Sequence, residues 1–186
     1  IVIPCTLDAR KLGSFTLRTS GGTLTPIDES RDWYQYSVTG RWHRSSAGGC
    51  KHHKSFKGNP KVRIQVTGQS DKAGESPRGT TSRIVLVVAV TDPMSGTGSA
   101  VGVYVLQAEP GPAPERLYTK DVVWSTEFVE GCDLDVVGQG ELAPGHYTIV
   151  PCTFDQGVEG TFQLTIYSDT IVKVLPQDSY FGELQE

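Results

Sequence analysis

An internal repeat sets the size of the folding unit in this chain. Residues 1–17, IVIPCTLDARKLGSFTL, match residues 148–164, TIVPCTFDQGVEGTFQL, 147 positions later and without a gap. A period of this length is too long for a solenoid and is close to one whole domain, typically about 100–150 residues. We therefore expect one complete domain, preceded in residues 1–28 by the closing hairpin of another copy and a linker. Seven identical pairs carry the match: Pro4/Pro151, Cys5/Cys152, Thr6/Thr153, Asp8/Asp155, Gly13/Gly160, Phe15/Phe162 and Leu17/Leu164.

Strand signals recur along the chain, whereas helix signals are scarce. Segments such as WYQYSV alternate large or β-branched residues with polar ones, which is the period of a half-buried strand. Loops rich in glycine and proline separate these segments, and no helical pattern lies between them. The pattern predicts an all-β fold, an antiparallel eight-stranded β-sandwich. The eight expected strands are 33–38, 61–66, 83–90, 100–107, 121–128, 146–153, 161–168 and 170–175.

Charge is unevenly distributed along the sequence. Residues 40–63 contain seven Lys or Arg, three His and no acidic residue, although the whole chain has a net charge of -4. These residues either protect loop tips and strand edges from pairing with other strands, or form a docking surface for anionic lipid headgroups or an acidic protein segment. Nucleic acid is not expected as a partner, because no aromatic side chains are interleaved as a stacking platform. The candidate binding residues are Arg41, Arg44, Lys51, Lys54, Lys57, Lys61 and Arg63.

Cysteine usage and hydropathy bear on the compartment. Four cysteines in 186 residues do not make a disulfide framework, and the sole asparagine, Asn59, precedes a proline and so is no glycosylation acceptor. The longest strongly apolar run, residues 84–90, is far shorter than the roughly 20 residues of a membrane-spanning helix. We therefore expect a cytoplasmic location. Peripheral binding to membranes is a second expectation.

Two groups of polar residues are candidates for metal or catalytic sites. Cys50, His52 and His53 lack a second ligand pair for zinc and lack the setting of a protease nucleophile, so no catalytic residue is expected. Candidate calcium ligands are Glu130, Asp133 and Asp135, because a β-sandwich can bring oxygen-bearing loops together at one end. The alternative for these carboxylates is a solvated acidic rim, and no other cofactor is expected.

Ordered motifs between residues 40 and 169 resemble those of a known family. Trp42 is followed by SAGGC at 46–50, by Phe56 and by Asn59-Pro60; VGVYV follows at 101–105 and LAPGHYTIVPCTFDQGVEGTFQLTIYSD at 142–169. This order resembles the C2-like domain of calpains, also called calpain domain III. The resemblance covers about residues 29–175 and leaves 176–186 as a C-terminal tail. It implies two such domains in tandem, as in the atypical PalB-like branch of calpains.

The resemblance implies mostly structural roles for individual residues. The cysteine, histidine and asparagine of calpain proteolysis belong to a separate core, so this chain is expected to be non-catalytic within a calpain-like cysteine protease. The loop equivalent to the family's acidic loop is 68–82, whose mixed charges argue against an inherited calcium role. The residues implied as core or framework are Trp42, Cys50, Phe56, Tyr147, Pro151, Phe162 and Leu164.

These observations predict a regulatory and interaction module. The domain is expected to position the protease core and to contact that core, the preceding C2-like domain and acidic protein segments. Two alternatives remain open: a peripheral domain that binds anionic phospholipid, and a structural scaffold in a calpain-like protein with a degenerate protease core.

Overall fold

The computed structural model describes residues 33–68, 81–91, 100–110, 119–130 and 135–175. The chain divides between Arg31 and Asp32 into two units, and every described residue belongs to the second. The predictions made for residues 1–28 and 176–186, and most of loop 68–82, lie outside the described residues. Within the described part, no helix is long and apolar enough to cross a membrane.

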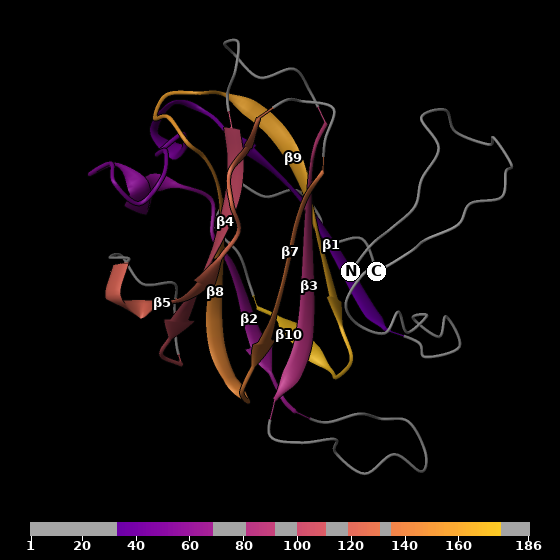
Figure 1. The fold of residues 1–186 in the computed structure, drawn as a ribbon. Coiled ribbons are helices and arrows are strands. Elements are labelled where there is room, and N and C mark those ends of the chain that lie inside the picture. The colour runs from indigo at the N-terminus through magenta and orange to yellow at the C-terminus, as the bar shows by residue number, and fades with distance from the viewer. Residues whose placement is uncertain (1–32, 69–80, 92–99, 111–118, 131–134, 176–186) are drawn as a thin grey trace, which may run out of the picture. The chain divides into compact units, whose positions relative to one another are not determined.

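Two antiparallel sheets form the domain, and Figure 1 shows them facing each other. Alternation of β-branched and polar residues places one face of each strand against the opposite sheet. The first sheet, here called sheet A, runs β1 (Tyr34–Trp42), β9 (Gly160–Ser168), β3 (Ser82–Val90) and β7 (Val136–Leu142). Sheet B runs β10 (Val172–Val174), β2 (Val62–Val66), β8 (Gly145–Thr153), β4 (Ala100–Ala108) and β5 (Val122–Ser125), and β6 (Val129–Glu130) pairs with β4. Three short 3₁₀ turns are η1 (Arg44–Ser46), η2 (Phe56–Gly58) and η3 (Thr119–Asp121).

The core between the sheets contains Trp42, which is almost fully buried. Its ring packs on that of Phe162 with centroids 4.5 Å apart, and its indole N–H donates a hydrogen bond to the Pro151 carbonyl at 3.1 Å. That bond joins the last residue of β1 in sheet A to β8 in sheet B. Burial of the indole therefore leaves no unpaired donor, which is the condition for a tryptophan deep in a core.

The all-β sandwich prediction is confirmed, but the prediction of eight strands is wrong. Only β5 falls within the expected strand 121–128, and β6 lies beyond its end; the register of β5 against β4 also shifts between Val105 and Leu106. Strand β7, VVGQGEL, was missed because glycine is unfavourable in strand interiors. A Cβ added at Gly138 or Gly140 would lie 2.9 Å or less from the Trp124 ring. The glycines in β7 therefore make room for an indole from β5 of the other sheet.

The framework residues implied by the family resemblance are all buried. Trp42 and Cys50 expose 1% of their surface, Phe56 4%, Tyr147 3%, and Phe162 and Leu164 none. Pro151 lies within the buried stretch of β8. Cys152, the equivalent of Cys5 in the repeat, is a buried free cysteine, as expected of a small packing residue.

Candidate functional site: the basic loop between β1 and β2

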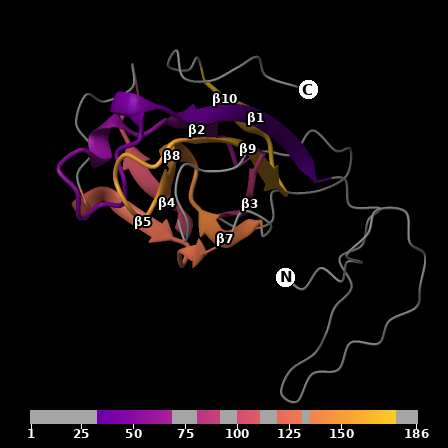
Figure 2. The same ribbon diagram turned by 90° about the horizontal axis from the view of Figure 1, so that it is seen from above.

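Residues 43–61, here called the basic loop, connect β1 of sheet A to β2 of sheet B. The loop contains η1 and η2 and runs along the outer face of sheet B. In Figure 2 it lies on the side of β4 and β8, away from β3 and β7. Its sequence carries five Lys or Arg, three His and no acidic residue.

A buried asparagine organises the basic loop. The Asn59 side chain is fully buried, and its Oδ1 accepts a hydrogen bond from the Gly48 amide at 3.0 Å. Its Nδ2 donates to the carbonyls of Gly49 at 2.7 Å and Phe56 at 3.0 Å. One side chain thus satisfies three backbone groups that no strand pairs, and a buried amide can remain only where its own atoms are paired in this way.

The paired glycines of the loop are required by its path. A Cβ on Gly48 would lie 2.3 Å from the Ser55 carbonyl oxygen, closer than real atoms approach. Gly49 has a φ of +74°, which L-residues rarely adopt. The motif SAGGC is therefore a device that folds the loop back on itself and fixes its shape.

The loop is also fastened to the turn between β8 and β9. The Cys50 amide donates to the Phe154 carbonyl at 3.0 Å, and the Gly157 amide donates to the Ala47 carbonyl at 2.8 Å. At the rim, Glu159 accepts a hydrogen bond from the Arg44 amide at 3.0 Å and lies 3.1 Å from Nδ1 of His43. The amide of Arg44 first, and His43 second, lower the pKa of the Glu159 carboxyl below its ordinary value.

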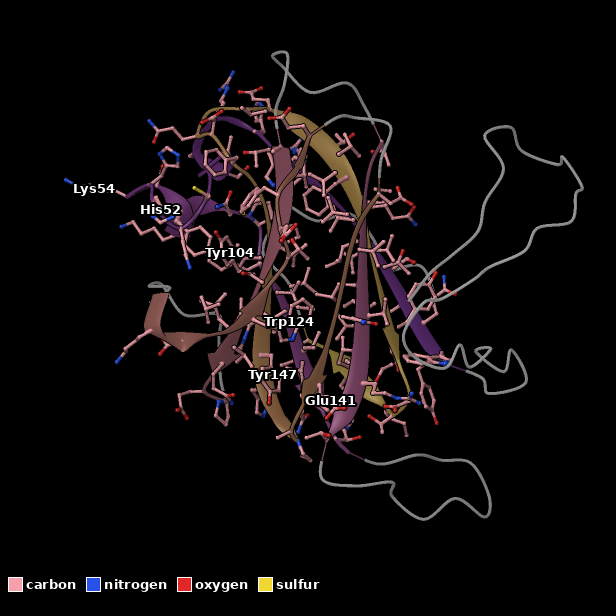
Figure 3. All side chains as sticks on the ribbon, in the orientation of Figure 1. His52, Lys54, Tyr104, Trp124, Glu141 and Tyr147 are labelled. Carbon is pink, nitrogen blue, oxygen red and sulfur yellow. The ribbon has the colours of Figure 1, made fainter. Side chains whose placement is uncertain are left out.

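An apolar cluster lies between the basic loop and sheet B. Phe56 from the loop meets the ring of Tyr104 edge-on, with centroids 5.3 Å apart, and the Lys51 ammonium lies 5.6 Å from the centroid of the same ring. Leu106, Val150 and Cys152 complete the cluster. Figure 3 shows Tyr104 directed from the sheet toward the loop.

The ionisable groups in this cluster are held neutral. Burial first, and Cys152 second, raise the pKa of Tyr104 to about 12. Burial and the neighbouring Cys50 raise the pKa of the Cys152 thiol well above its ordinary value. A thiol that is fully buried and disfavours the thiolate is a poor nucleophile, so the chemistry here is that of packing.

The structure separates the seven predicted binding residues. Lys54 and Lys57 are exposed on the basic loop, and Lys54 projects away from both sheets in Figure 3. Arg44 is exposed near the start of the loop, while Lys51 and Lys61 are half-buried. Arg41 is exposed on β1, on the outer face of sheet A, because Trp42 beside it points into the core.

Arg63 does not lie on the predicted surface. It exposes only 3% of its area, and one of its terminal nitrogens, Nη2, donates to the Glu109 carbonyl at 2.8 Å. Arg63 is therefore buried and does not share an exposed surface with Lys54 and Lys57, and its role in binding stays a prediction. Strand alternation explains where Arg63 lies. Val62 and Ile64 face the core, so the side chain of Arg63 points to the outer face of sheet B.

Sequence reasoning missed an exposed aromatic residue beside the basic loop. Phe154 lies in the turn between β8 and β9 and exposes 45% of its area. Its ring packs edge-on against Phe128 with centroids 5.3 Å apart, and its carbonyl accepts the Cys50 amide at 3.0 Å. The available signal was an apolar residue in the otherwise polar turn FDQG, next to the repeated PCT motif.

The calcium candidates do not converge in the described part of the chain. Glu130 at the end of β6 and Asp135 before β7 are both exposed, and Asp133 lies outside the described residues. Among the residues that the structure describes, no group of three His, Cys, Asp or Glu side chains is placed to hold a metal ion. Cys50, His52 and His53 form no such group either.

Comparison with known proteins places this architecture in a family. The family described as calpain large subunit, domain III, matches residues 38–167. A putative calpain-like cysteine protease A of Dictyostelium discoideum is 28% identical over 186 residues, covering 94% of this chain and 26% of that protein. The calpain-2 catalytic subunit of Mus musculus is 26% identical over 159 residues, covering 79% of this chain and 23% of the subunit.

One similar protein is named for a different chemistry. A serine/threonine-protein kinase 4 homolog B of Dictyostelium discoideum is 28% identical over 178 residues, covering 91% of this chain and 15% of the kinase homolog. The chain thus spans about a quarter or less of the length of these relatives. Residues 38–167 contain the whole basic loop and most of both sheets, but not β10 or the start of β1. This chain belongs to the calpain domain III family.

Proposed function

We propose that this domain is a non-catalytic docking module, whose basic loop binds an acidic surface and so positions a catalytic core of the protein that carries it. The observation that carries the proposal is a basic loop without carboxylates that is fixed in shape by Asn59 and by the turn between β8 and β9. A preorganised loop loses little conformational entropy when it binds, so more of its contact energy appears as affinity.

The relatives support a role that does not depend on one reaction. A protein named as a calpain-like cysteine protease, a calpain-2 catalytic subunit and a protein named as a serine/threonine-protein kinase homolog each contain a region similar to this chain. A domain that serves both kinds of protein contributes contact and position instead of reacting groups. The cysteine protease is our proposal for the parent protein, because most of the relatives named here are calpains.

The docking proposal predicts a specific charge dependence. Exposed ion pairs are worth only about 0–1 kcal/mol each, so Lys54 and Lys57 act together with Arg44 and Lys51. Reversing two of these charges, in Lys54→Glu/Lys57→Glu, should weaken binding of a poly-glutamate peptide to the 186-residue chain roughly tenfold. The matched control, Arg83→Glu/Lys120→Glu, reverses two exposed charges elsewhere and should have little effect.

A second candidate, binding of anionic phospholipid, is favoured by Phe154. An exposed aromatic ring beside several cations is the arrangement by which proteins attach to membrane interfaces, with roughly 1 kcal/mol from each basic residue near the surface. Cosedimentation with vesicles of phosphatidylserine and phosphatidylcholine distinguishes the two. Vesicle binding lost in Phe154→Ala, with peptide binding retained, would favour the membrane.

Peptide binding with no vesicle binding supports docking to protein. Both interactions should weaken as salt is raised, since the screening length is about 10 Å at 0.1 M. If Lys54→Glu/Lys57→Glu changes neither interaction, the basic loop is not a docking surface, and the domain serves as a structural scaffold.

A further inference from the structure

Four buried side-chain atoms in the described residues have no hydrogen-bond partner: Arg63 Nε, Thr148 Oγ1, His146 Nδ1 and Trp124 Nε1. The first three belong to neighbouring strands of sheet B, and Trp124 lies apart on β5. Unpartnered buried polar atoms are rare in folded proteins, so three in one small area require an explanation.

The strand register brings these three residues to one face. Arg63 on β2 is the direct partner of Thr148 on β8, and direct cross-strand neighbours have Cβ atoms about 5 Å apart. His146 lies two residues from Thr148 on the same strand and therefore on the same face. The alternating partners Ile64 and Tyr147 point into the core, so this is the outer face of sheet B.

The charge on this face is not balanced from within the sheet. Strands β10, β2, β8 and β4 contain no Asp or Glu. Arg63 exposes only 3% of its area, and Lys173 places a second positive charge on the same face. The ion pairs formed between described residues join His43 to Glu159 and Arg83 to Asp169, and neither involves Arg63. Its one hydrogen bond goes to a neutral carbonyl. A buried guanidinium without an anion is strongly unfavourable.

All three unpartnered atoms can act as donors. Arg63 Nε carries a hydrogen, the Thr148 hydroxyl rotates freely, and His146 Nδ1 donates in one neutral tautomer and in the imidazolium form. The group that satisfies several donors and a positive charge together is one that only accepts hydrogen bonds and carries negative charge. We propose that the outer face of β2 and β8 binds an oxyanion group, a carboxylate or a phosphate, through Arg63, Thr148 and His146.

This oxyanion site does not depend on the docking role of the basic loop. The test is thermal unfolding of the 186-residue chain in sodium phosphate or sodium acetate, against sodium chloride of equal ionic strength. Ligand at about ten times its Kd should raise the Tm of a domain of this size by roughly 3–6 °C. A shift in acetate identifies a carboxylate as a sufficient ligand, and a shift in phosphate alone identifies a phosphate.

Variants separate this site from general salt effects. Arg63→Met removes the charge, and Thr148→Val removes the hydroxyl with little change of shape, so both should lose the anion-dependent shift. Arg83→Met, which removes an exposed cation outside the site, and Lys54→Glu/Lys57→Glu, which alters the basic loop, should keep it. No shift in the unmodified chain, or equal shifts in Arg63→Met and Thr148→Val, would overturn the proposal. No shift would mean that neither anion binds, and equal shifts would mean that the anion binds elsewhere.

Discussion

The two ends of the outer face of sheet B differ in how their polar groups are satisfied. At the end near Cys152, the basic loop covers Tyr104 with Phe56, and the buried amide of Asn59 has partners for both its oxygen and its nitrogen. At the other end, Arg63 and Thr148 are as deeply buried, yet Arg63 Nε and Thr148 Oγ1 have no partner. Burial alone therefore does not distinguish a structural residue from a ligand-binding one; the pairing of each polar atom does.

Of the substitutions predicted here, replacement of Asn59 should lower the free energy of unfolding most. Asn59→Ala leaves the Gly48 amide and the Gly49 carbonyl without their partner, and each buried unsatisfied group costs about 1–3 kcal/mol. We expect the free energy of unfolding, measured in urea, to fall by about 4 kcal/mol. Ser55→Ala, a control at a half-buried residue of the same loop, should lose about 1 kcal/mol. A loss below about 1 kcal/mol in Asn59→Ala would show that the loop does not depend on this amide.

Phe56 and Phe154, at the end of the face near Cys152, should contribute differently to the free energy of unfolding. Phe56 is buried and contacts Tyr104, so Phe56→Ala should lower the free energy of unfolding by about 3 kcal/mol. Phe154 is nearly half exposed, and Phe154→Ala should cost less than about 1 kcal/mol. Urea denaturation of the two variants under one condition makes the comparison. Equal losses would contradict the view that Phe56 anchors the loop while Phe154 remains free to bind.

At the end of the face with Arg63 and Thr148, substitution of a buried residue should do little harm. Replacing a buried charge by an apolar side chain of similar length is often neutral or stabilising. Arg63→Met should therefore change the free energy of unfolding in chloride buffer by less than about 1 kcal/mol, or raise it. A loss of about 3 kcal/mol or more would mean that Arg63 is paired within the fold, and the contrast between the two ends would disappear.

The smallest expected effect on stability is at Glu159, which contacts the start of the basic loop. Its folded pKa is lowered, so its contribution to stability is present above the ordinary value of 4.5 and is lost as the pH falls through the folded pKa. Glu159→Gln should thus be less stable than the unmodified chain near neutral pH, and the difference should vanish in acid. Urea midpoints across this range, with Glu130→Gln as the exposed control, provide the measurement. A difference that persists in acid would exclude the carboxylate as its cause.

Much of the sandwich could be predicted from local sequence. Alternating patterns such as WYQYSV and KVRIQV correspond to β1 and β2, because the period of two directly reflects which face of a strand is buried. Buried framework residues such as Trp42 and Phe162 were also identified correctly, through the family motifs. Strand β7 was not predicted, because its glycines make room for Trp124 on β5, a contact that the local sequence of β7 does not show.

The candidate sites were predicted less well for a similar reason. A count of Lys and Arg locates the basic loop, since consecutive loop residues remain near one another in space. It does not separate Lys54, which faces solvent, from Arg63, which strand register turns toward a covered face. Nor does it show Phe154 beside the loop, because the contact with Cys50 joins residues 104 positions apart. Tertiary pairing, which the local pattern does not encode, decides these positions.

The contact between Trp124 and the two glycines of β7 has an evolutionary consequence. A larger residue at Gly138 or Gly140 would collide with the indole, and a smaller residue at position 124 would leave a void between the sheets. Either change alone is therefore harmful, although the two together could be tolerated. Divergence within this family should consequently proceed at these three positions in a linked order, with the reduction of Trp124 coming before any side chain appears at position 138 or 140.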